Sequence, residues 1–171
     1  MPRSSKPRKA YRPRPAGGVD TMALAKTQVA MLDQDQQIQG IRDARIGFAD
    51  LRAGRGGRDA WAAIVGRLDV ALCLAQHHGI ASDRVPELTA GLQALADLFE
   101  RAACSRSWTM RGPEISAVQR ALDLYAIQLQ YVAQGELMRA AATVRMRHQQ
   151  VRAGNVPAGA IVLDGRAGAA A

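Results

Sequence analysis

The chain has 171 residues, of which 48% are hydrophobic and only 4% aromatic, and its formal net charge is +8. The length allows one domain with a substantial core, and a core built from Ala, Leu, Ile, Val and Met favours packed helices over sandwiched sheets. No run approaches the roughly 18 to 20 apolar residues of a membrane span, and no apolar stretch follows the charged N-terminus. We therefore expect neither a membrane protein nor a secretion signal, and a cytoplasmic location.

The positive charge is concentrated at the N-terminus. Residues 1–16 contain six cations and no acid, whereas residues 17–171 contain 17 basic and 15 acidic residues. Segment 1–18 also holds four prolines, so it favours neither a helix nor a core and predicts a disordered basic arm. The candidate nucleic-acid contacts of this arm are its cations and its one aromatic residue: Arg3, Lys6, Arg8, Lys9, Tyr11, Arg12 and Arg14.

Two helices are predicted after the arm. Asp20 is a candidate N-cap for a first helix over residues 21–34, in which Met22, Ala25, Val29 and Leu32 keep a helical spacing. The stretch 34–39 is very polar, and the apolar pattern resumes from Ile38 to Leu51. The pattern fits one bent helix or two separate helices, and we favour two.

The glycine-rich stretch 53–58 predicts an interior break. Asp59 is the predicted cap of a third helix that ends at Gly79 in the position of a left-handed C-cap. A fourth helix should open at Ser82 or Asp83 and extend to about residue 104, with Gly91 as a weak point beside its apolar stripe.

The strongest helix signal lies in residues 113–134. Pro113 suits a first helical turn, and Val118, Leu122, Tyr125 and Leu129 recur at helical spacing. A second apolar set, formed by Leu124, Ile127 and Tyr131, makes the apolar stripe too wide for one neighbouring helix to cover. This pattern predicts the central helix of a bundle, with Gly135 as its stop or kink.

A sixth helix is predicted over residues 136–153, and it is the most basic one. Arg139, Arg145, Arg147 and Arg152 are accompanied by a single acid, Glu136. Residues 154–171 are rich in Gly and Ala and predict a flexible tail, with one apolar patch at 160–163. The sequence thus predicts an all-α bundle of about five to six helices over residues 19–153, between the arm at 1–18 and the tail.

No catalytic motif or cofactor fingerprint is present. His77 and His78 are adjacent, so on a helix they point about 100° apart and do not easily share one metal. His148 suits a basic face, and both cysteines, Cys73 and Cys104, fit reduced core residues. Trp108 suits either an exposed contact patch or a residue that pins its loop. We expect a non-enzymatic protein without a metal or cofactor.

Two hypotheses of function remain. In the first, the arm neutralises phosphates of DNA or RNA without a sequence code, and Arg145, Arg147 and Arg152 contribute if they share a surface. The arm also fits a solubilising tail or a proline-rich peptide that docks on a protein. In the second hypothesis the chain is an adaptor or inhibitor of a host complex, and an exposed set of Leu124, Ile127 and Tyr131 would be covered by a partner or a homodimer.

The segments KPRKAYRPRP and DTMALA, together with the later LDLYAIQLQ, resemble parts of small helical proteins carried by phages, prophages and plasmids of proteobacteria. This resemblance implies an accessory protein of a mobile element that acts in a bacterial cytoplasm. It supplies no catalytic residues.

Overall fold

The computed structural model describes residues 29–154 of the chain. Within this range the chain forms five α-helices and one 3-10 turn: α2 (Gln34–Arg52), α3 (Arg58–His78), η1 (Ser82–Arg84), α4 (Val85–Ser105), α5 (Gly112–Tyr131) and α6 (Gln134–Arg152). The only extended pairing among these residues is an isolated bridge between Met31 and Ala133. The all-α prediction is confirmed, while the predicted arm at 1–18 and most of the tail lie outside the described residues.

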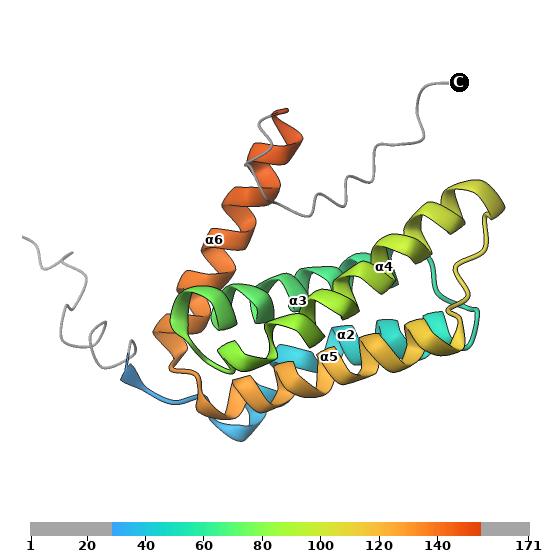
Figure 1. Cartoon of the computed structure of the whole chain (residues 1–171). Coiled ribbons are helices and arrows are strands. Elements are labelled where there is room, and N and C mark those ends of the chain that lie inside the picture. The colour runs from blue at the N-terminus through green and yellow to red at the C-terminus, as the bar shows by residue number, and fades with distance from the viewer. Residues whose placement is uncertain (1–28, 155–171) are drawn as a thin grey trace, which may run out of the picture.

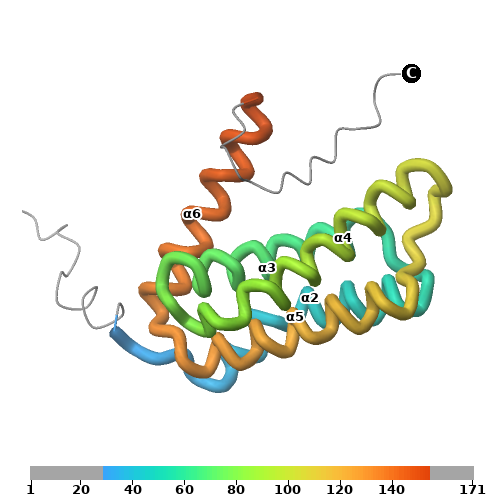
Figure 2. Tube along the Cα trace, viewed as in Figure 1, coloured from blue at the N-terminus to red at the C-terminus, as the bar shows by residue number. Residues whose placement is uncertain are grey.

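Four of the helices, α2 to α5, form an antiparallel up-and-down bundle (Figure 1). Helix α2 lies beside α3 and α5, and α4 lies beside α3 and α5, so the four helices enclose one core. Helix α6 leaves the end of α5 and crosses the bundle end at a steep angle, as the tube in Figure 2 shows. Both interhelical loops at the opposite end, 53–57 and 106–111, lie far from α6.

The helix that contacts all the others is α3, not α5. Helix α3 packs against α2, α4, α5 and α6, whereas α5 packs mainly against α2, α3 and α4. Nine residues of α3 are buried, including Ile64, Leu68 and Leu74, and Tyr125 of α5 is the largest fully buried side chain. The prediction that residues 113–134 form the central helix is therefore wrong, because the apolar faces of α3 are buried on more sides.

The break after α5 also differs from the prediction. The helix ends at Tyr131, Val132 is extended, and α6 begins at Gln134, so Gly135 lies buried within the first turn of α6. The cause is the pairing of Ala133 with Met31, which holds the backbone of both segments extended. Residues 30–33 are not helical and α2 starts at Gln34 with Asp33 as its cap, so the predicted end of the first helix at residue 34 is wrong. Residues 21–28 of that predicted helix lie outside the described residues.

Two predicted caps are replaced by neighbouring residues. Gly57 caps α3, and Asp59 lies in the first turn instead. Ser82 and Asp83 belong to the 3-10 turn, and α4 follows with Pro86 in its first turn. The stop at Gly79 is confirmed, with a φ of 71° that glycine adopts without steric cost.

Gly91 is a position of close helix packing. A Cβ built on Gly91 would lie 2.5 Å from the Cβ of Ala121 on α5. Real Cβ atoms do not approach so closely, so the hydrogen side chain of Gly91 lets α4 and α5 pack tightly. The predicted weak point in α4 is therefore where two helices meet most closely.

Polar groups fix the junctions between helices. Gln128 is fully buried on α5, and its Nε2 donates to the carbonyl oxygens of Ala71 at 3.1 Å and Ile80 at 2.8 Å. One amide thus joins the middle of α3 to the segment after its C-terminus. The Oε1 of Gln128 has no hydrogen-bond partner among the described residues.

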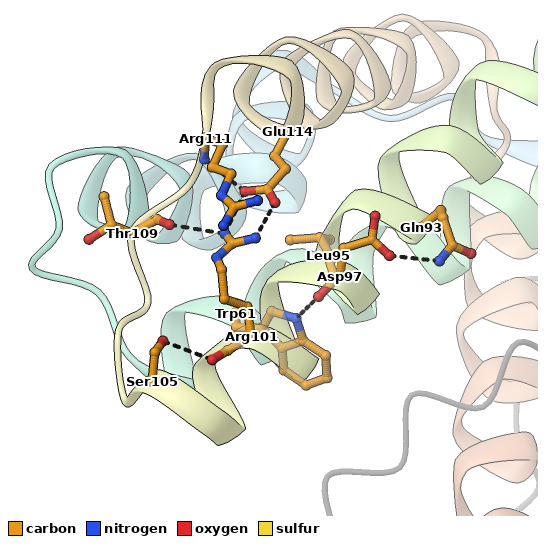
Figure 3. A network of polar contacts seen from close by, with 9 residues as sticks. All are labelled: Trp61, Gln93, Leu95, Asp97, Arg101, Ser105, Thr109, Arg111 and Glu114. Atoms are coloured by element: carbon orange, nitrogen blue, oxygen red, sulfur yellow. Dashed lines mark hydrogen bonds and ion pairs between the residues drawn. The ribbon is translucent and has the colours of Figure 1, made fainter.

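The loop between α4 and α5 is held by an ion-pair network (Figure 3). The guanidinium of Arg101 donates to both carboxylate oxygens of Glu114, at 2.5 and 2.7 Å, and to the carbonyl of Thr109 at 3.1 Å. The backbone N–H of Arg111 donates to Glu114 at 2.7 Å. Burial alone would raise the pKa of Glu114, but these hydrogen bonds and the nearby positive charge outweigh it and lower the pKa below its ordinary value.

An aromatic cluster packs beside this network. The ring of Trp61 lies 4.8 Å from that of Phe99 and 6.3 Å from that of Trp108, between centroids, and its Nε1 donates to the carbonyl of Leu95 at 2.8 Å. Met110 in the same loop is buried. Trp108 therefore pins the loop onto the bundle, which confirms the second of its two interpretations.

Candidate nucleic-acid interface

Helix α6 starts at a well-defined junction. The backbone N–H of Gln134 donates to the carbonyl of Ala30 at 2.8 Å, next to the Met31–Ala133 bridge. Glu136 accepts a hydrogen bond from the N–H of Ala133 at 3.1 Å and places its negative charge at the positive end of the helix dipole. The base of α6 and the point where the chain enters from the N-terminal segment are thus held together.

One face of α6 packs on α3. Ala140 and Val144 are buried in this contact, and Leu137 and Ala141 are half-buried beside them. At the rim, Nε2 of His148 lies 2.8 Å from a carboxylate oxygen of Asp69, and Arg147 lies 2.8 Å from Nε2 of His77. A guanidinium only donates hydrogen bonds, so Nε2 of His77 is the acceptor in this contact.

The sequence neighbours of His148 predicted a place on a basic face. The structure instead places His148 in the contact between α6 and α3. Its hydrogen bond to Asp69 raises its pKa, against opposing effects of burial and of Arg152. The protonated imidazole is therefore favoured where α6 meets α3.

The opposite face of α6 is open to solvent along its length. Helical spacing brings two adjacent rows of side chains onto this face, and all of them are exposed. We call this set the outer face of α6, and it consists of Met138, Arg139, Ala142, Arg145, Met146, Gln149, Gln150 and Arg152. It contains three cations and no acid.

The structure separates the arginines predicted to act together. Arg145 and Arg152 are seven residues apart and share the outer face. Arg147 lies about 200° around the helix from Arg145 and is directed towards His77 at the α3 contact. Arg139 joins the outer face in its place, a position that the spacing from Met146 indicates but that our sequence-based site did not include.

Some arginines of the described chain have partners and others do not. Within residues 29–133, five arginines pair with carboxylates, as in Arg45 with Asp123 at 3.4 Å and Arg84 with Glu87 at 3.0 Å. The guanidinium groups of Arg139 and Arg145 have no hydrogen-bond or ion-pair partner among the described residues. Their charge is therefore available to an external anion.

The net charge follows the same division. Residues 29–133 contain 11 basic and 12 acidic residues, whereas α6 contains four basic residues and one acidic residue. The predicted contacts Arg3 to Arg14 lie outside the described residues. The segment that carries them joins the described chain at Val29, two residues before the bridge at the base of α6.

Other carboxylates and the two cysteines of the described chain are explained by packing, by ion pairs or by exposure. Asp43 and Asp50 pair with Arg67 and Arg55 at 3.9 and 3.6 Å. Cys73 is buried, and burial raises the pKa of its thiol, which keeps it protonated and unreactive. Cys104 is exposed, which corrects its prediction as a core residue, because it lies on the outer side of the last turn of α4.

The described residues also offer neither a metal site nor a membrane-spanning helix. No group of three or more His, Cys, Asp or Glu side chains in residues 29–154 is placed to hold a metal ion. In the same range, no helix combines the length and apolar character needed to cross a bilayer.

Taken together, fold and surface define a four-helix bundle that carries a fifth, basic helix across one end. Comparisons with protein-family models, with curated proteins and with solved structures give no significant match to this chain.

Proposed function

We propose that this protein binds nucleic acid without catalysing a reaction, with the basic arm and α6 as its two phosphate-contacting elements. The observation that carries this proposal is the separation of charge. The bundle up to residue 133 is close to neutral, whereas α6 carries four basic residues and one acidic residue. Arg139 and Arg145, whose guanidinium groups are unpaired, lie on this helix, which starts where the arm-bearing segment enters. Cations grouped in this way gain affinity for a polyanion by releasing its counterions.

The reach of the chain is compatible with a joint surface. Ten residues, 19–28, connect the arm to Val29 and span at most about 35 Å when extended. Helix α6 has 19 residues and a length of about 28 Å. The arm can therefore contact the same nucleic acid that lies along α6.

The biological setting is inferred from the resemblance to proteins of phages and plasmids. It assigns the chain to the accessory proteins of a mobile element in a bacterial cytoplasm. Weak sequence specificity suits such a role, because contacts to phosphates carry no direct sequence information.

The test is fluorescence anisotropy with DNA and RNA across a salt series. It compares the intact chain with one that starts at Gly17 and with a full-length variant in which the six arm cations are replaced by glutamine. Each phosphate contact contributes about −0.9 to the slope of log K against log salt for duplex DNA, so both changes should flatten the slope by up to about five units. Because the glutamine variant keeps the length of the arm, it separates charge from chain length.

Equal affinities and slopes for the three proteins would refute a role of the arm. A second candidate function would then take precedence, an adaptor or inhibitor that acts through a face of the bundle. It is favoured by Ile127 and Tyr131, which are 47% and 68% exposed and lie four residues apart on α5. Leu124, the third member of that predicted set, is half-buried against the core.

A further inference from the structure

We propose that the ligand of α6 is double-stranded DNA and that the outer face of α6 lies in its major groove. This inference rests on the proposed function and specifies which nucleic acid is bound and how. It is drawn from the shape, the side chains and the support of α6.

The shape of α6 matches the groove. A single helix is about 10 to 12 Å wide with its side chains, and the major groove of B-form DNA is about 12 Å wide. The outer face extends from residue 138 to residue 152, a rise of about 21 Å, which corresponds to about six base pairs. Since α6 is packed closely only against α3 and projects from the bundle end, its outer side is accessible (Figure 1).

The side chains of the outer face suit base edges in that groove. Arginine pairs with guanine and glutamine with adenine, while small apolar groups contact the methyl group of thymine. Arg139, Arg145 and Gln149 supply the first two kinds of contact, and Ala142 supplies the third. The absence of any acid from this face leaves no repulsion of the flanking phosphates.

The same composition disfavours the other nucleic acids. Single strands are bound largely by stacking of bases on aromatic rings, and the outer face of α6 contains no aromatic residue. Double-stranded RNA has a deep and narrow major groove that side chains do not read. Of the three classes, duplex DNA is the one that the outer face fits.

The support of α6 is rigid on the side away from the groove. The contacts of His148 with Asp69 and of Arg147 with His77 hold α6 on α3 near its C-terminal end, and the hydrogen bond from Gln134 to Ala30 holds its base. A recognition helix fixed at both ends needs little ordering when it binds.

The experiment measures binding of the intact protein and of the double variant R139Q/R145Q to three probes of equal length: duplex DNA, single-stranded DNA and double-stranded RNA. A control double variant, R42Q/R120Q, removes the same charge from exposed arginines of α2 and α5. We expect the intact protein to prefer duplex DNA. R139Q/R145Q should weaken duplex binding roughly tenfold and relax the preference for guanine at the contacted base pairs, while the control changes affinity less than twofold.

Gln149→Ala tests the sequence preference of binding, which a change of charge alone would not alter. Selection from random duplexes should give the intact protein a preference over about six base pairs, and this variant should alter the preference while leaving the salt slope unchanged. Circular dichroism of each variant confirms the helical content.

The failures of the two proposals are distinguishable. If removal of the arm abolishes binding but R139Q/R145Q behaves like R42Q/R120Q, the assignment of α6 to the major groove is overturned and the proposed function stands. A preference of the intact protein for single-stranded DNA or double-stranded RNA also overturns the assignment of α6 to the major groove. Failure of the intact protein to bind any probe would refute both proposals, and binding of an acidic protein in place of DNA would refute the choice of ligand.

Discussion

A single hydrogen atom in place of a methyl group allows α4 and α5 to pack closely at Gly91. Gly91→Ala should destabilise the fold by about 1 to 3 kcal/mol, because the new methyl group would meet the Cβ of Ala121 and the carbonyl of Ala117. Gly66→Ala in α3 is the matched control, since a Cβ there meets no atom within 4 Å. The control should be neutral or stabilising by up to about 1 kcal/mol, as alanine is the better helix former.

Urea unfolding measures both variants. An unchanged midpoint for Gly91→Ala would show that the two helices separate at little cost. Gly47 offers a second site of the same kind, because its Cβ would lie 2.6 Å from the backbone carbonyl oxygen of Ala60.

The carboxylate of Glu114 should control part of the acid sensitivity of the protein. Its pKa is lower in the folded than in the unfolded state, so its contribution to stability is present above the unfolded pKa of about 4.3 and is lost as the pH falls through the folded value. Glu114→Gln should cost roughly 2 to 3 kcal/mol at pH 7, because Arg101 is left partly buried without its counter-charge.

Two controls accompany this variant in urea titrations between pH 3 and pH 7. Glu87→Gln breaks an exposed ion pair with Arg84 and should change stability little. The double change of Arg101→Met and Glu114→Leu removes both charges and should cost less than Glu114→Gln alone. Parallel pH profiles for Glu114→Gln and the unchanged protein would contradict the assigned role.

At the scale of the element, α6 should dock on α3 in a pH-dependent way. The pKa of His148 is raised in the folded protein, so its hydrogen bond to Asp69 stabilises the docked helix below the ordinary histidine pKa of about 6.5 and weakens as the pH rises through the folded value.

Hydrogen exchange of the α6 amides, corrected for intrinsic rates, measures this docking between pH 6 and pH 9. Protection should fall with rising pH in the intact protein, and Asp69→Asn should weaken that dependence. Asp123→Asn, which breaks the surface pair with Arg45, is the control and should leave it unchanged. Equal pH profiles for the intact protein and Asp69→Asn would exclude His148 as the cause.

The elements themselves show how far the sequence predicts the fold. Apolar periodicity identified α3, α4 and α5, and Gly79 identified the end of α3, because these signals depend on neighbouring residues. The junction at Ala133 was missed because it depends on Met31, about one hundred residues away. The prediction of which helix is central was wrong for the same reason. Helix α3 is central because it packs against four other helices, and these contacts cannot be read from the sequence of α3 alone.

The candidate site was predictable in composition and less so in geometry. The charge of α6 was evident from the sequence, but which arginine faces α3 depends on His77 and on the crossing of the two helices. Arg139 and Gln149 join the site only once the buried face of α6 is known. The arm residues from Arg3 to Arg14 remain a prediction.

At the scale of the whole molecule, the two ends of the bundle differ in character. One end holds the aromatic cluster of Trp61, Phe99 and Trp108. The same end holds the Arg101–Glu114 network, whose polar groups bind one another within the fold (Figure 3). The other end carries α6 and the entry of the N-terminal segment, and there the guanidinium groups of Arg139 and Arg145 have no partner among the described residues. The polar and aromatic clusters and the proposed binding surface thus lie at opposite ends, so variants of the outer face of α6 should leave the bundle intact.

The pairing of Met31 with Ala133 also bears on how the protein is made. It joins segments about one hundred residues apart, so it closes a long loop at an entropic cost and forms only after α2 to α5 have left the ribosome. The antiparallel hairpins of the bundle need only neighbouring segments and can assemble earlier in synthesis. The outer face of α6 is therefore the last surface of the described chain to be oriented, and a nascent chain completes most of its folding before it can present that surface.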